Sequence, residues 1–561
     1  MKRKRKQSKA AYGRVCLLTY LILAVLVLRQ VPLKRDLHKR ALCHGDETGS
    51  INMKIWVGMH AWDEPGLLER AVRSVLSQKL TDGRHRVVLD VRLVVFVDRC
   101  GADANVVTRK LCRRNKRCNI IGALDRDTCP EQGSAFAKWE IINHVRRQAD
   151  PHDYFTLLDG DDKYTSRSTL MNIFLGVLLP TRPNFAWGSQ TGKFNEECKE
   201  SHMPGTYARA LVPWVFCHPR FFRVRLLSDL NVSMFKRSNG SWLQKATDRP
   251  LVYAALETSP EKITHIRGGP HVSYTFGKKN GLKRFSKHII SGDKQQVMAR
   301  LPLKSWPLEI HLFCAIFDRP NTIYFMDHLL QSELGEYKVR VHIANNKASR
   351  QAELVALAAL KSTDQITFDV TAMPSNLGGM ARFLLLKQMM RVYLIDFAVF
   401  IDDDQYVGKQ SILNLWAQRE NRAMVSWFGK CWDNAESKYW VPTFGFNQIH
   451  QNSSFPKVWH YAGTGFSIVD TLIFSDPRVF QIPDEYFYVE DLWLSYILSV
   501  NTWKRKRAFV SITQSNESHS GQFNNLKKVK ERMFRQLNTC PTPFIEYSKH
   551  RVCDVPLMSG K

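Results

Sequence analysis

Short apolar runs and amphipathic segments alternate twice along this chain. In the first half, apolar runs typical of strands occur at 54–59, 91–97 and 154–158, and apolar residues at helical spacing cover 64–78 and 135–145. In the second half, strand-like runs occur at 309–317, 337–343 and 397–401, and helix-like segments at 322–334 and 380–393. Alternation of strand and helix predicts a parallel sheet with right-handed crossovers in each half. The expected fold class is therefore α/β, with the second half repeating the first in outline.

Chain length supports two folding units. A chain of 561 residues exceeds what one ordinary core holds, and two domains of about 250 residues account for it. We expect a first domain over 53–295 and a second over 296–561. A short appendage over 1–52 precedes them.

The appendage contains an uncharged apolar run, Val15–Leu28, bounded by Arg14 and Arg29. It is short for a membrane span and overlaps in length with a signal-peptide core, but flanking residues extend it toward the roughly 20 residues needed. No small-residue cleavage site follows it. We therefore expect an uncleaved transmembrane signal anchor over 15–31, a cytosolic basic tail over 1–14 and a stem over 32–52. This predicts a single-pass type II protein of the Golgi or endoplasmic reticulum membrane, with its catalytic part in the lumen.

The net charge of +29 changes the list of partners to consider. Residues 1–50 hold twelve Lys or Arg against three acidic residues, so most of the excess lies on the body of the chain. Such a body suits nucleic acid, an anionic membrane or acidic substrates such as sugar nucleotides. The basic residues are scattered and no zinc-finger spacing occurs, so we expect no nucleic-acid partner.

The twelve cysteines fit a lumenal location. Eleven of them follow the expected span, so disulfides are permitted there, although spacing does not give their pairing. The cluster Cys100, Cys112, Cys118 and Cys129 could instead bind zinc, but it lacks the Cys-x2-Cys spacing of a zinc knuckle.

Two acidic groups follow matching strands. Asp159-Gly160-Asp161-Asp162 comes after the run at 154–158, and Asp402-Asp403-Asp404 comes after the run at 397–401. Ligands of open parallel α/β sheets bind beyond the carboxyl ends of the strands. Adjacent carboxylates repel one another unless a cation binds them, and hard oxygen ligands beside a diphosphate favour Mg²⁺ or Mn²⁺. The alternative is a pair of ordinary solvated acidic turns.

A second acid recurs at the same distance from each group. Asp248 lies 87 residues after Asp161, and Asp491 lies 87 residues after Asp404. Each opens an apolar helical stretch, so helix capping is the alternative role. The repeated offset favours a general base that deprotonates an acceptor hydroxyl while a metal stabilises the leaving diphosphate.

These motifs resemble those of known enzymes. Both halves resemble the GT-A glycosyltransferase fold, a Rossmann-like nucleotide-diphospho-sugar transferase fold, and the first resembles glycosyltransferase family 2. In the first half the resemblance rests on the following residues: Asp63, Glu64, Leu68, Ser74, Gln78, Asp98, the Asp159–Asp162 group and Ala246-Thr247-Asp248-Arg249. In the second, more divergent half it rests on the DxD-like Asp402–Asp404, the Gly463-Thr464-Gly465 turn and Glu490-Asp491.

The resemblance implies roles for these positions. Asp98 would contact the nucleotide base, the groups containing Asp159, Asp161, Asp402 and Asp404 would bind the diphosphate, and Asp248 and Asp491 would be general bases. The metal ligands it implies are the following: Asp161, Asp162, Asp404, His271 and His519. Two departures affect donor recognition, namely Met59-His60-Ala61-Trp62 after the first strand and Asn345-Asn346 where the family often has an Asp. A lone His is also more often structural than ligating.

Aromatic residues crowd the segment between Asp404 and Asp491, where a GT-A acceptor site would lie. They are Trp427, Phe428, Trp432, Tyr439, Trp440, Phe444, Phe446, Trp459, His460 and Tyr461. Aromatic faces stack on sugar rings, and the basic surround suits an anionic acceptor, although core packing explains most of such residues.

The leading hypothesis is a bifunctional, metal-dependent, inverting glycosyltransferase that moves sugars from UDP- or GDP-linked donors to a glycan acceptor. The alternative is one catalytic domain with a degenerate partner that binds glycan or stabilises the fold. A third possibility, a basic scaffold for anionic glycan or lipid, does not explain the clustered carboxylates.

Overall fold

The computed structural model describes residues 51–61, 65–82, 87–97, 102–113, 115–122, 133–191, 216–259, 262–274, 287–300, 303, 308–319, 322–432, 437–442, 459–514, 520–539 and 544–545. Within these ranges no helix has the length and apolar character needed to cross a membrane. The expected tail and anchor, 1–14 and 15–31, lie outside them, as does almost all of the expected stem.

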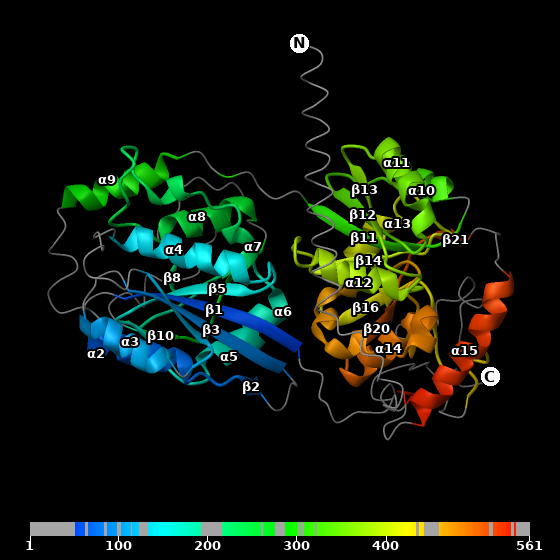
Figure 1. Ribbon diagram of the computed structural model, residues 1–561, viewed down its shortest axis with the longest axis horizontal. Helices are drawn as coiled ribbons and strands as arrows, with labels where there is room; N and C mark the ends of the chain where they lie inside the picture. The colour runs from blue at the N-terminus through cyan, green and yellow to red at the C-terminus, as the bar shows by residue number, and fades with distance from the viewer. Residues whose placement is uncertain are drawn as a thin grey trace, which may run out of the picture.

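The first half contains an eight-stranded mixed sheet covered by helices on both faces (Figure 1). Its path runs β2-β3-β1-β5-β8-β7-β9, and β4 adds to β3. The strands are β1 (Ile51–Ala61), β2 (Thr81–Asp82), β3 (Val87–Val97), β4 (Cys118–Ile121), β5 (Tyr154–Asp159), β7 (Phe185–Gly188), β8 (Cys217–Arg223) and β9 (Ile263–His265). The pairs β4–β3, β3–β1 and β1–β5 are parallel, and β5–β8 and β8–β7 are antiparallel.

The second half contains a seven-stranded sheet in the order β13-β12-β11-β14-β19-β16-β20. The strands are β11 (Glu309–Ile316), β12 (Lys338–Asn345), β13 (Ile366–Ala372), β14 (Phe397–Phe400), β16 (Ala423–Ser426), β19 (Ser467–Asp470) and β20 (Lys504–Arg507). Here β13–β12, β12–β11 and β11–β14 are parallel, and β14–β19 and β19–β16 are antiparallel.

The two sheets share one topology. The central strands β1 and β11 occupy equivalent positions, because each has a parallel neighbour on both sides, β3 and β5 for β1, and β12 and β14 for β11. Both sheets end in a parallel pair, β7–β9 in the first and β16–β20 in the second. Each acidic group is followed by a short antiparallel ladder, β6 (Lys163–Tyr164) with β10 (Val272–Ser273), and β15 (Gln405–Val407) with β21 (Ile512–Gln514). The expected repetition of the first half by the second is therefore present strand by strand.

The helices follow from amphipathic segments of the sequence. In α2, the buried residues Leu68, Ala71, Val72 and Val75 recur at helical spacing and pack on the sheet. The first half contains α2 (Pro65–Leu76), α3 (Ala102–Cys112), α4 (Gly133–Gln148), α5 (Thr169–Ile173), η3 (Phe174–Leu178), α6 (Leu179–Thr181), α7 (Val224–Leu227), η4 (Val232–Phe235), α8 (Arg249–Thr258) and α9 (Lys287–Met298). The second half contains α10 (Thr322–Leu330), η6 (Ala348–Arg350), α11 (Gln351–Lys361), α12 (Met380–Met389), α13 (Ser411–Ala417), η8 (Thr471–Ser475), η9 (Pro477–Phe480), η10 (Asp484–Val489), α14 (Glu490–Val500) and α15 (Ser520–Asn538). A further strand pair, β17 (Gly429–Lys430) with β18 (Tyr461–Ala462), lies in the second half.

The boundary expected between residues 295 and 296 falls inside α9. Val297 on this helix packs in the core of the first half, and Arg300 donates hydrogen bonds to the carbonyls of Met234 and Lys236. Leu303 donates its backbone N–H to Glu257 of α8. The first unit therefore extends past residue 300.

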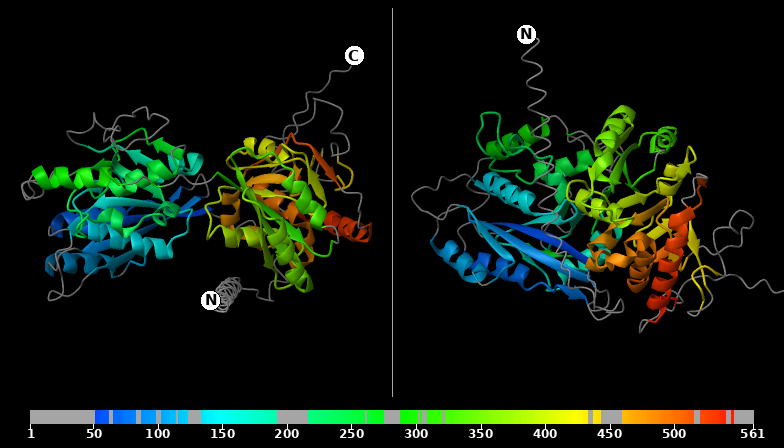
Figure 2. Two further views of the ribbon diagram at one scale, coloured as in Figure 1. Left: turned by 90° about the horizontal axis from the view of Figure 1, so that it is seen from above. Right: turned by 45° about the vertical axis from the view of Figure 1, so that its right-hand side comes forward.

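The halves lie side by side and meet through buried charges (Figures 1 and 2). Asp396, just before β14, accepts hydrogen bonds from Arg223 Nη2 at 3.1 Å and Lys262 Nζ at 3.0 Å. Arg182, just after α6, donates to the Asp396 carbonyl and pairs with Asp470 at the end of β19. These contacts gather at the beginning of β5 and β14, whereas the acidic groups follow the ends of the same strands. Each acidic group therefore lies at the end of its sheet that is remote from the contact.

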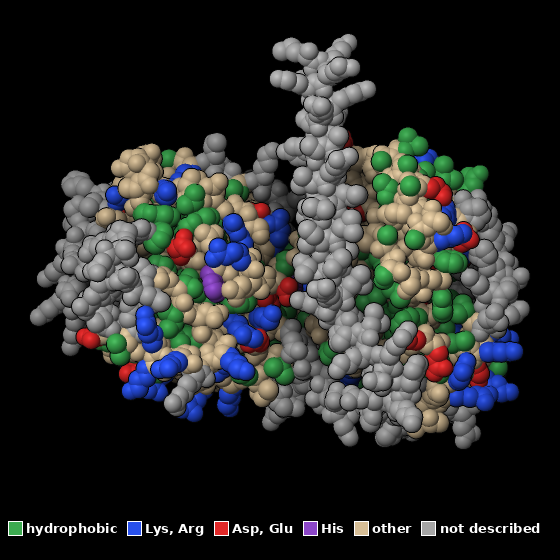
Figure 3. Space-filling model, in the orientation of Figure 1, with side chains coloured by type: hydrophobic (Ala, Val, Ile, Leu, Met, Phe, Trp, Pro, Cys, Tyr) green, Lys and Arg blue, Asp and Glu red, His purple; other side chains and the backbone are tan. Residues whose placement is uncertain are grey.

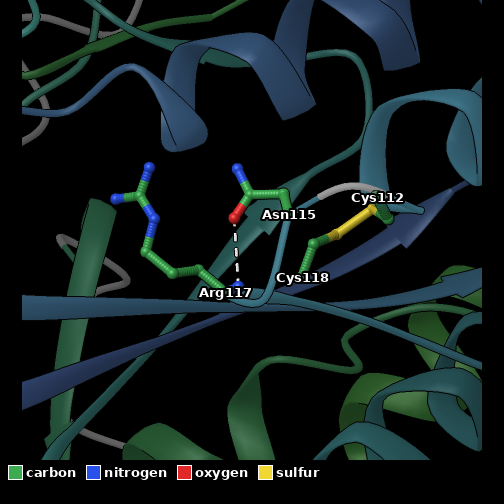
Figure 4. Close-up of a disulfide and its surroundings, with 4 residues drawn as sticks. All are labelled: Cys112, Asn115, Arg117 and Cys118. Atoms are coloured by element: carbon green, nitrogen blue, oxygen red, sulfur yellow. Dashed lines mark hydrogen bonds between the residues drawn. A yellow bond between two sulfur atoms is a disulfide. The ribbon is translucent and has the colours of Figure 1, made fainter.

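One disulfide joins Cys112, the last residue of α3, to Cys118, the first residue of β4 (Figure 4). It closes a tight turn in which the Asn115 side chain accepts a hydrogen bond from the Arg117 backbone. Cys217 and Cys431 each take part in a further disulfide. Oxidised cysteines are typical of secreted and lumenal proteins.

Candidate functional site

The first acidic group occupies the turn between β5 and β6. Gly160 donates its N–H to the His60 carbonyl at the end of β1, and Asp162 donates to the Asp159 carbonyl. The Asp162 side chain is buried, while Asp159 and Asp161 are partly exposed. This arrangement places carboxylates at the carboxyl end of two parallel strands, as the sequence predicts.

Helix α2 and Gln78, two residues beyond its end, support the segment that follows this turn. The Ser74 hydroxyl accepts a hydrogen bond from the Tyr164 backbone, and the Gln78 amide donates to the Ser166 carbonyl and accepts from the Leu170 backbone. Ser74 and Gln78, two residues on which the family resemblance rests, therefore fix the segment after the acidic group and do not themselves reach its carboxylates.

Asp248 stands at the N-cap position of α8 but makes no capping hydrogen bond. Its two oxygens instead bind Lys138 of α4 and Arg220 Nη1 of β8, the latter at 2.6 Å. Burial alone would raise the pKa of Asp248, but Lys138 and Arg220 outweigh it and hold the pKa well below its usual range. Capping is therefore not the role of this carboxylate, which stays ionised and fixed in orientation.

Tyr274, next to β10, is a site residue that sequence reasoning missed. Burial and then the negative charges of Asp159, Asp162, Asp161 and Asp248 raise its pKa to about 12. Four carboxylates therefore act on one phenol, so the structure brings the acidic group and Asp248 into a single site. The pairing of β10 with β6 places Tyr274 there, and two-residue strands give little sequence signal.

His271 lies at the other end of the same ladder. Its backbone carbonyl accepts from Thr165, and burial followed by the charge of His265 lowers the pKa of its imidazole. The described residues show no contact between its side chain and the acidic group. The charges of the carboxylates act on Tyr274, and the metal-binding role of His271 stays a prediction. Asp98 and His519 lie outside the described residues.

The second acidic group is tied to arginines. Arg382 of α12 binds Asp402 Oδ1 at 2.8 Å and Glu490 Oε1 at 3.1 Å. Arg319, just after β11, binds Asp403 Oδ1 at 2.6 Å and Asp404 Oδ2 at 3.0 Å. A cation entering this group would have to compete with two guanidinium groups for the same oxygens.

The two arginines neutralise only part of the negative charge of the four carboxylates that they bind. Burial, together with the charges of Asp404 and Asp402, raises the pKa of Asp403 to about 7 against the opposing effect of Arg319. Burial and the charges of Asp491 and Asp402 raise the pKa of Glu490 to about 7 as well. Part of the negative charge of this group is therefore neutralised by protonation near neutral pH.

Glycines make room for this network. A Cβ on Gly465 would lie 2.5 Å from Asp402 Oδ2, and a Cβ on Gly379 would overlap the Glu490 carboxylate. The Thr464 hydroxyl donates to Glu490 Oε1. The Gly463-Thr464-Gly465 turn identified in the sequence thus borders the acidic group.

Asp491 is held from the C-terminal helix. Lys530 of α15 binds Asp491 Oδ2 at 2.8 Å, and the Tyr461 hydroxyl binds the same oxygen. Met533 and Phe534 of the same helix belong to the buried core, so the helix that carries Lys530 is firmly packed. Burial alone would raise the pKa of Asp491, but Lys530 and Tyr461 outweigh this effect and hold the pKa below its usual value.

Asn345 and Asn346, expected near the donor base, are occupied by local structure. The Asn345 amide donates to Gln351 and its oxygen accepts from the Lys347 backbone. The Asn346 side chain bonds to Leu377 and Gly378 of the following loop. Both side chains therefore shape the end of β12.

Most of the aromatic residues proposed for sugar stacking are core residues. Trp427, Trp432, Tyr439, Trp459, His460 and Tyr461 are buried, whereas Phe428 and Trp440 remain partly exposed. Phe444 and Phe446 lie outside the described residues. Core packing explains the buried six, since aromatic rings contribute large apolar areas to cores.

Metal binding depends on the donor set. Among the described residues, no three His, Cys, Asp or Glu side chains form a ready-made metal cage in either half. Mg²⁺ in nucleotide sites is commonly held by one or two carboxylates together with substrate phosphates. The partly exposed Asp159 and Asp161 fit that mode, while the arginine-bound oxygens of Asp402 and Asp404 fit it poorly.

No known family model matches the chain, and no curated protein matches it. It is similar to solved glycosyltransferase structures. With S. aureus TarS 1–349 it shares 14% identity at a TM-score of 0.28, covering 40% of this chain and 60% of that one. With the mannosyltransferase PcManGT from Pyrobaculum calidifontis, solved with GDP-Man and Mn²⁺, it shares 17% identity at a TM-score of 0.23, covering 39% of this chain and 55% of that one. With GalNAc-T7, solved with UDP, GalNAc and Mn²⁺, it shares 9% identity at a TM-score of 0.29, covering 36% of this chain and 42% of that one. The match thus spans about half the length of these chains.

Proposed function

We propose that this protein is a glycosyltransferase that moves a sugar from a nucleotide-sugar donor to a glycan acceptor, with the reaction in its first half. One observation carries the proposal. The charges of Asp159, Asp161, Asp162 and Asp248 all act on Tyr274, and Asp248 is bound to Arg220 of β8, the strand that pairs with β5 and its acidic turn.

In this proposal the acidic turn binds the donor diphosphate. Asp159 and Asp161 would hold Mn²⁺ or Mg²⁺, which when bound neutralises the charge of the departing diphosphate. Asp248 is held in its ionised form by Lys138 and Arg220, so it is oriented to accept the proton of an acceptor hydroxyl. Since a lowered pKa makes it a weak base, proton transfer would accompany departure of the diphosphate. The acceptor oxygen would form its bond to the anomeric carbon on the face opposite to the bond that breaks to the diphosphate, and this single displacement would give inversion.

The second half has the same topology but a different charge balance. Its acidic group binds Arg319 and Arg382, whereas the candidate bases of the two halves are both ion-paired, Asp248 with Lys138 and Arg220 and Asp491 with Lys530. The arginines on the acidic group favour a supporting or glycan-binding role. The bifunctional hypothesis retains one specific support, the strand-by-strand repetition that places both acidic groups equivalently.

The surroundings we propose follow from the sequence and the disulfides. An uncleaved anchor over 15–31 would leave the body in the Golgi or endoplasmic reticulum lumen, where Cys112–Cys118 would form. Lys and Arg side chains lie in scattered groups over both halves of the face in Figure 3, which suits an anionic acceptor.

The test is a donor screen on the full chain in detergent, measuring nucleotide release from UDP- and GDP-sugars with Mn²⁺ and with chelator. Wild type should turn over a donor only with the metal. Asp161→Asn should abolish release, Asp404→Asn should leave most of it, and Asp229→Asn, in an ion pair with Arg225, serves as the control. Partial loss in both Asp161→Asn and Asp404→Asn would establish the bifunctional form. No turnover of any donor by wild type would rule out glycosyl transfer.

A further inference from the structure

His218 is a buried imidazole at the edge of the first site that the proposed reaction has not used. It lies on β8, three residues before Phe221, and Phe221 pairs with Thr156 of β5. Asp159 lies three residues after Thr156 on the antiparallel partner. The strand geometry therefore brings His218 beside the first carboxylate of the acidic group.

Electrostatics agree with this placement. The charges of both Asp159 and Asp248 act on the His218 imidazole, and the positive charges of Arg220 and Lys138 oppose them. Burial and then Arg220 lower the pKa of His218 to about 4. The ring is therefore neutral at physiological pH, and it feels both a carboxylate expected to bind the donor, Asp159, and the one expected to act as base, Asp248.

The equivalent position in the second half carries no side chain. There Ile468 of β19 pairs with Val399 of β14, and the residue three before Ile468 is Gly465, which lies against Asp402. The two halves thus differ at the same place. The first has an imidazole beside its acidic group, whereas the second has a glycine and an arginine-bound aspartate.

The imidazole has unused hydrogen-bonding capacity. Its backbone N–H is fixed by the Gln190 side chain, but its Nδ1 is buried and bonds to none of the described residues. A buried polar atom left without a partner costs about 1–3 kcal/mol, so such atoms in native structures call for an explanation. A ligand that supplies the missing hydrogen bond offsets that cost.

We infer that His218 is a sugar-contacting residue of the first half, whose Nδ1 forms a hydrogen bond with a hydroxyl group of the donor sugar. A sugar hydroxyl both donates and accepts, so it satisfies Nδ1 in either neutral tautomer. A contact with the sugar itself would distinguish a nucleotide sugar from the bare nucleotide. This inference rests on the proposed function and adds to it the residue that senses the transferred sugar.

The test is calorimetric titration of the full chain in detergent with Mn²⁺, using UDP, GDP, UDP-glucose, UDP-galactose, UDP-N-acetylglucosamine and GDP-mannose. His218→Phe should weaken the preferred nucleotide sugar roughly threefold to tenfold, the value of one net hydrogen bond, and change the matching bare nucleotide less than twofold. His218→Asn, which keeps a polar group near Nδ1, should restore most of the affinity. His144→Asn, which alters another imidazole with a buried, unbonded nitrogen on α4, should change neither affinity.

Three results would overturn the inference. Unchanged sugar-nucleotide affinity in His218→Phe would show that Nδ1 does not contact the sugar. Equal weakening of nucleotide and nucleotide sugar, or no rescue by Asn, would assign His218 a structural role while leaving the proposed function intact. Wild type that binds none of the six compounds would instead remove the proposed function, and the inference with it.

Discussion

Replacing Asp396 by Asn should weaken the junction between the two halves. The substitution keeps the shape of the side chain but removes the charge that faces Arg223 and Lys262. Lys262 is 43% exposed and contributes little, whereas the Arg223 side chain has no exposed surface. Leaving a buried guanidinium without its counter-charge costs about 3–5 kcal/mol, which for units of this size corresponds to a fall in Tm of roughly 10 °C.

Thermal and urea unfolding followed by tryptophan fluorescence would measure this effect. Although burial raises the pKa of Asp396, Lys262, Arg223 and Arg182 hold it far below its usual value. Its contribution is therefore complete at neutral pH and is lost only as the pH falls into the acid range. Asp369→Asn is a suitable control because Asp369 pairs with Arg340 but is 45% exposed, so we expect a change below about 1 kcal/mol. If Asp396→Asn unfolds within 1 kcal/mol of wild type, the buried junction does not hold the halves together.

Two further predictions concern stability within each half. Burial raises the pKa of Asp153 to about 6, so the stability that its proton contributes is complete below the unfolded pKa and is lost as the pH rises through 6, by about 3 kcal/mol in all. Roughly half of this loss, about 1.4 kcal/mol, falls between pH 5 and pH 8, where urea unfolding should show it in wild type but not in Asp153→Asn; equal pH dependence in the two would contradict the assignment. A Cβ at Gly429 would overlap the Trp459 ring, so Gly429→Ala should lower the Tm by several degrees, whereas Gly66→Ala, with open space around it in a helix, should not lower it; similar values for the two would show that Trp459 can move aside.

The central strands and helices could be predicted from the sequence. The run at 54–59 lies within β1, the run at 397–401 contains β14, and the segment at 135–145 lies within α4, because each has a strong local apolar pattern. Strands such as β8 and β19 were missed. They take their place through long-range antiparallel pairing with β5 and β14, and a local pattern does not encode such partners.

The candidate site divides in the same way. Asp159 and Asp248 could be located because a strand end and a repeated spacing mark them, and in the structure the charges of both act on Tyr274. The counter-charges could not be located. Lys138 and Lys530 reach their aspartates from α4 and α15, which are far away in sequence, and only the folded chain shows that the carboxylates are already paired.

The junction at the beginning of β5 and β14 sets a distance for any glycan that both halves would handle. The two acidic groups lie beyond the opposite ends of these strands, which have six and four residues, so roughly 30 Å of sheet separates them. A single growing end cannot occupy both places at once. A short product would have to dissociate and diffuse around the molecule between additions, whereas a chain of several sugars could be gripped by the second half while its tip reacts in the first.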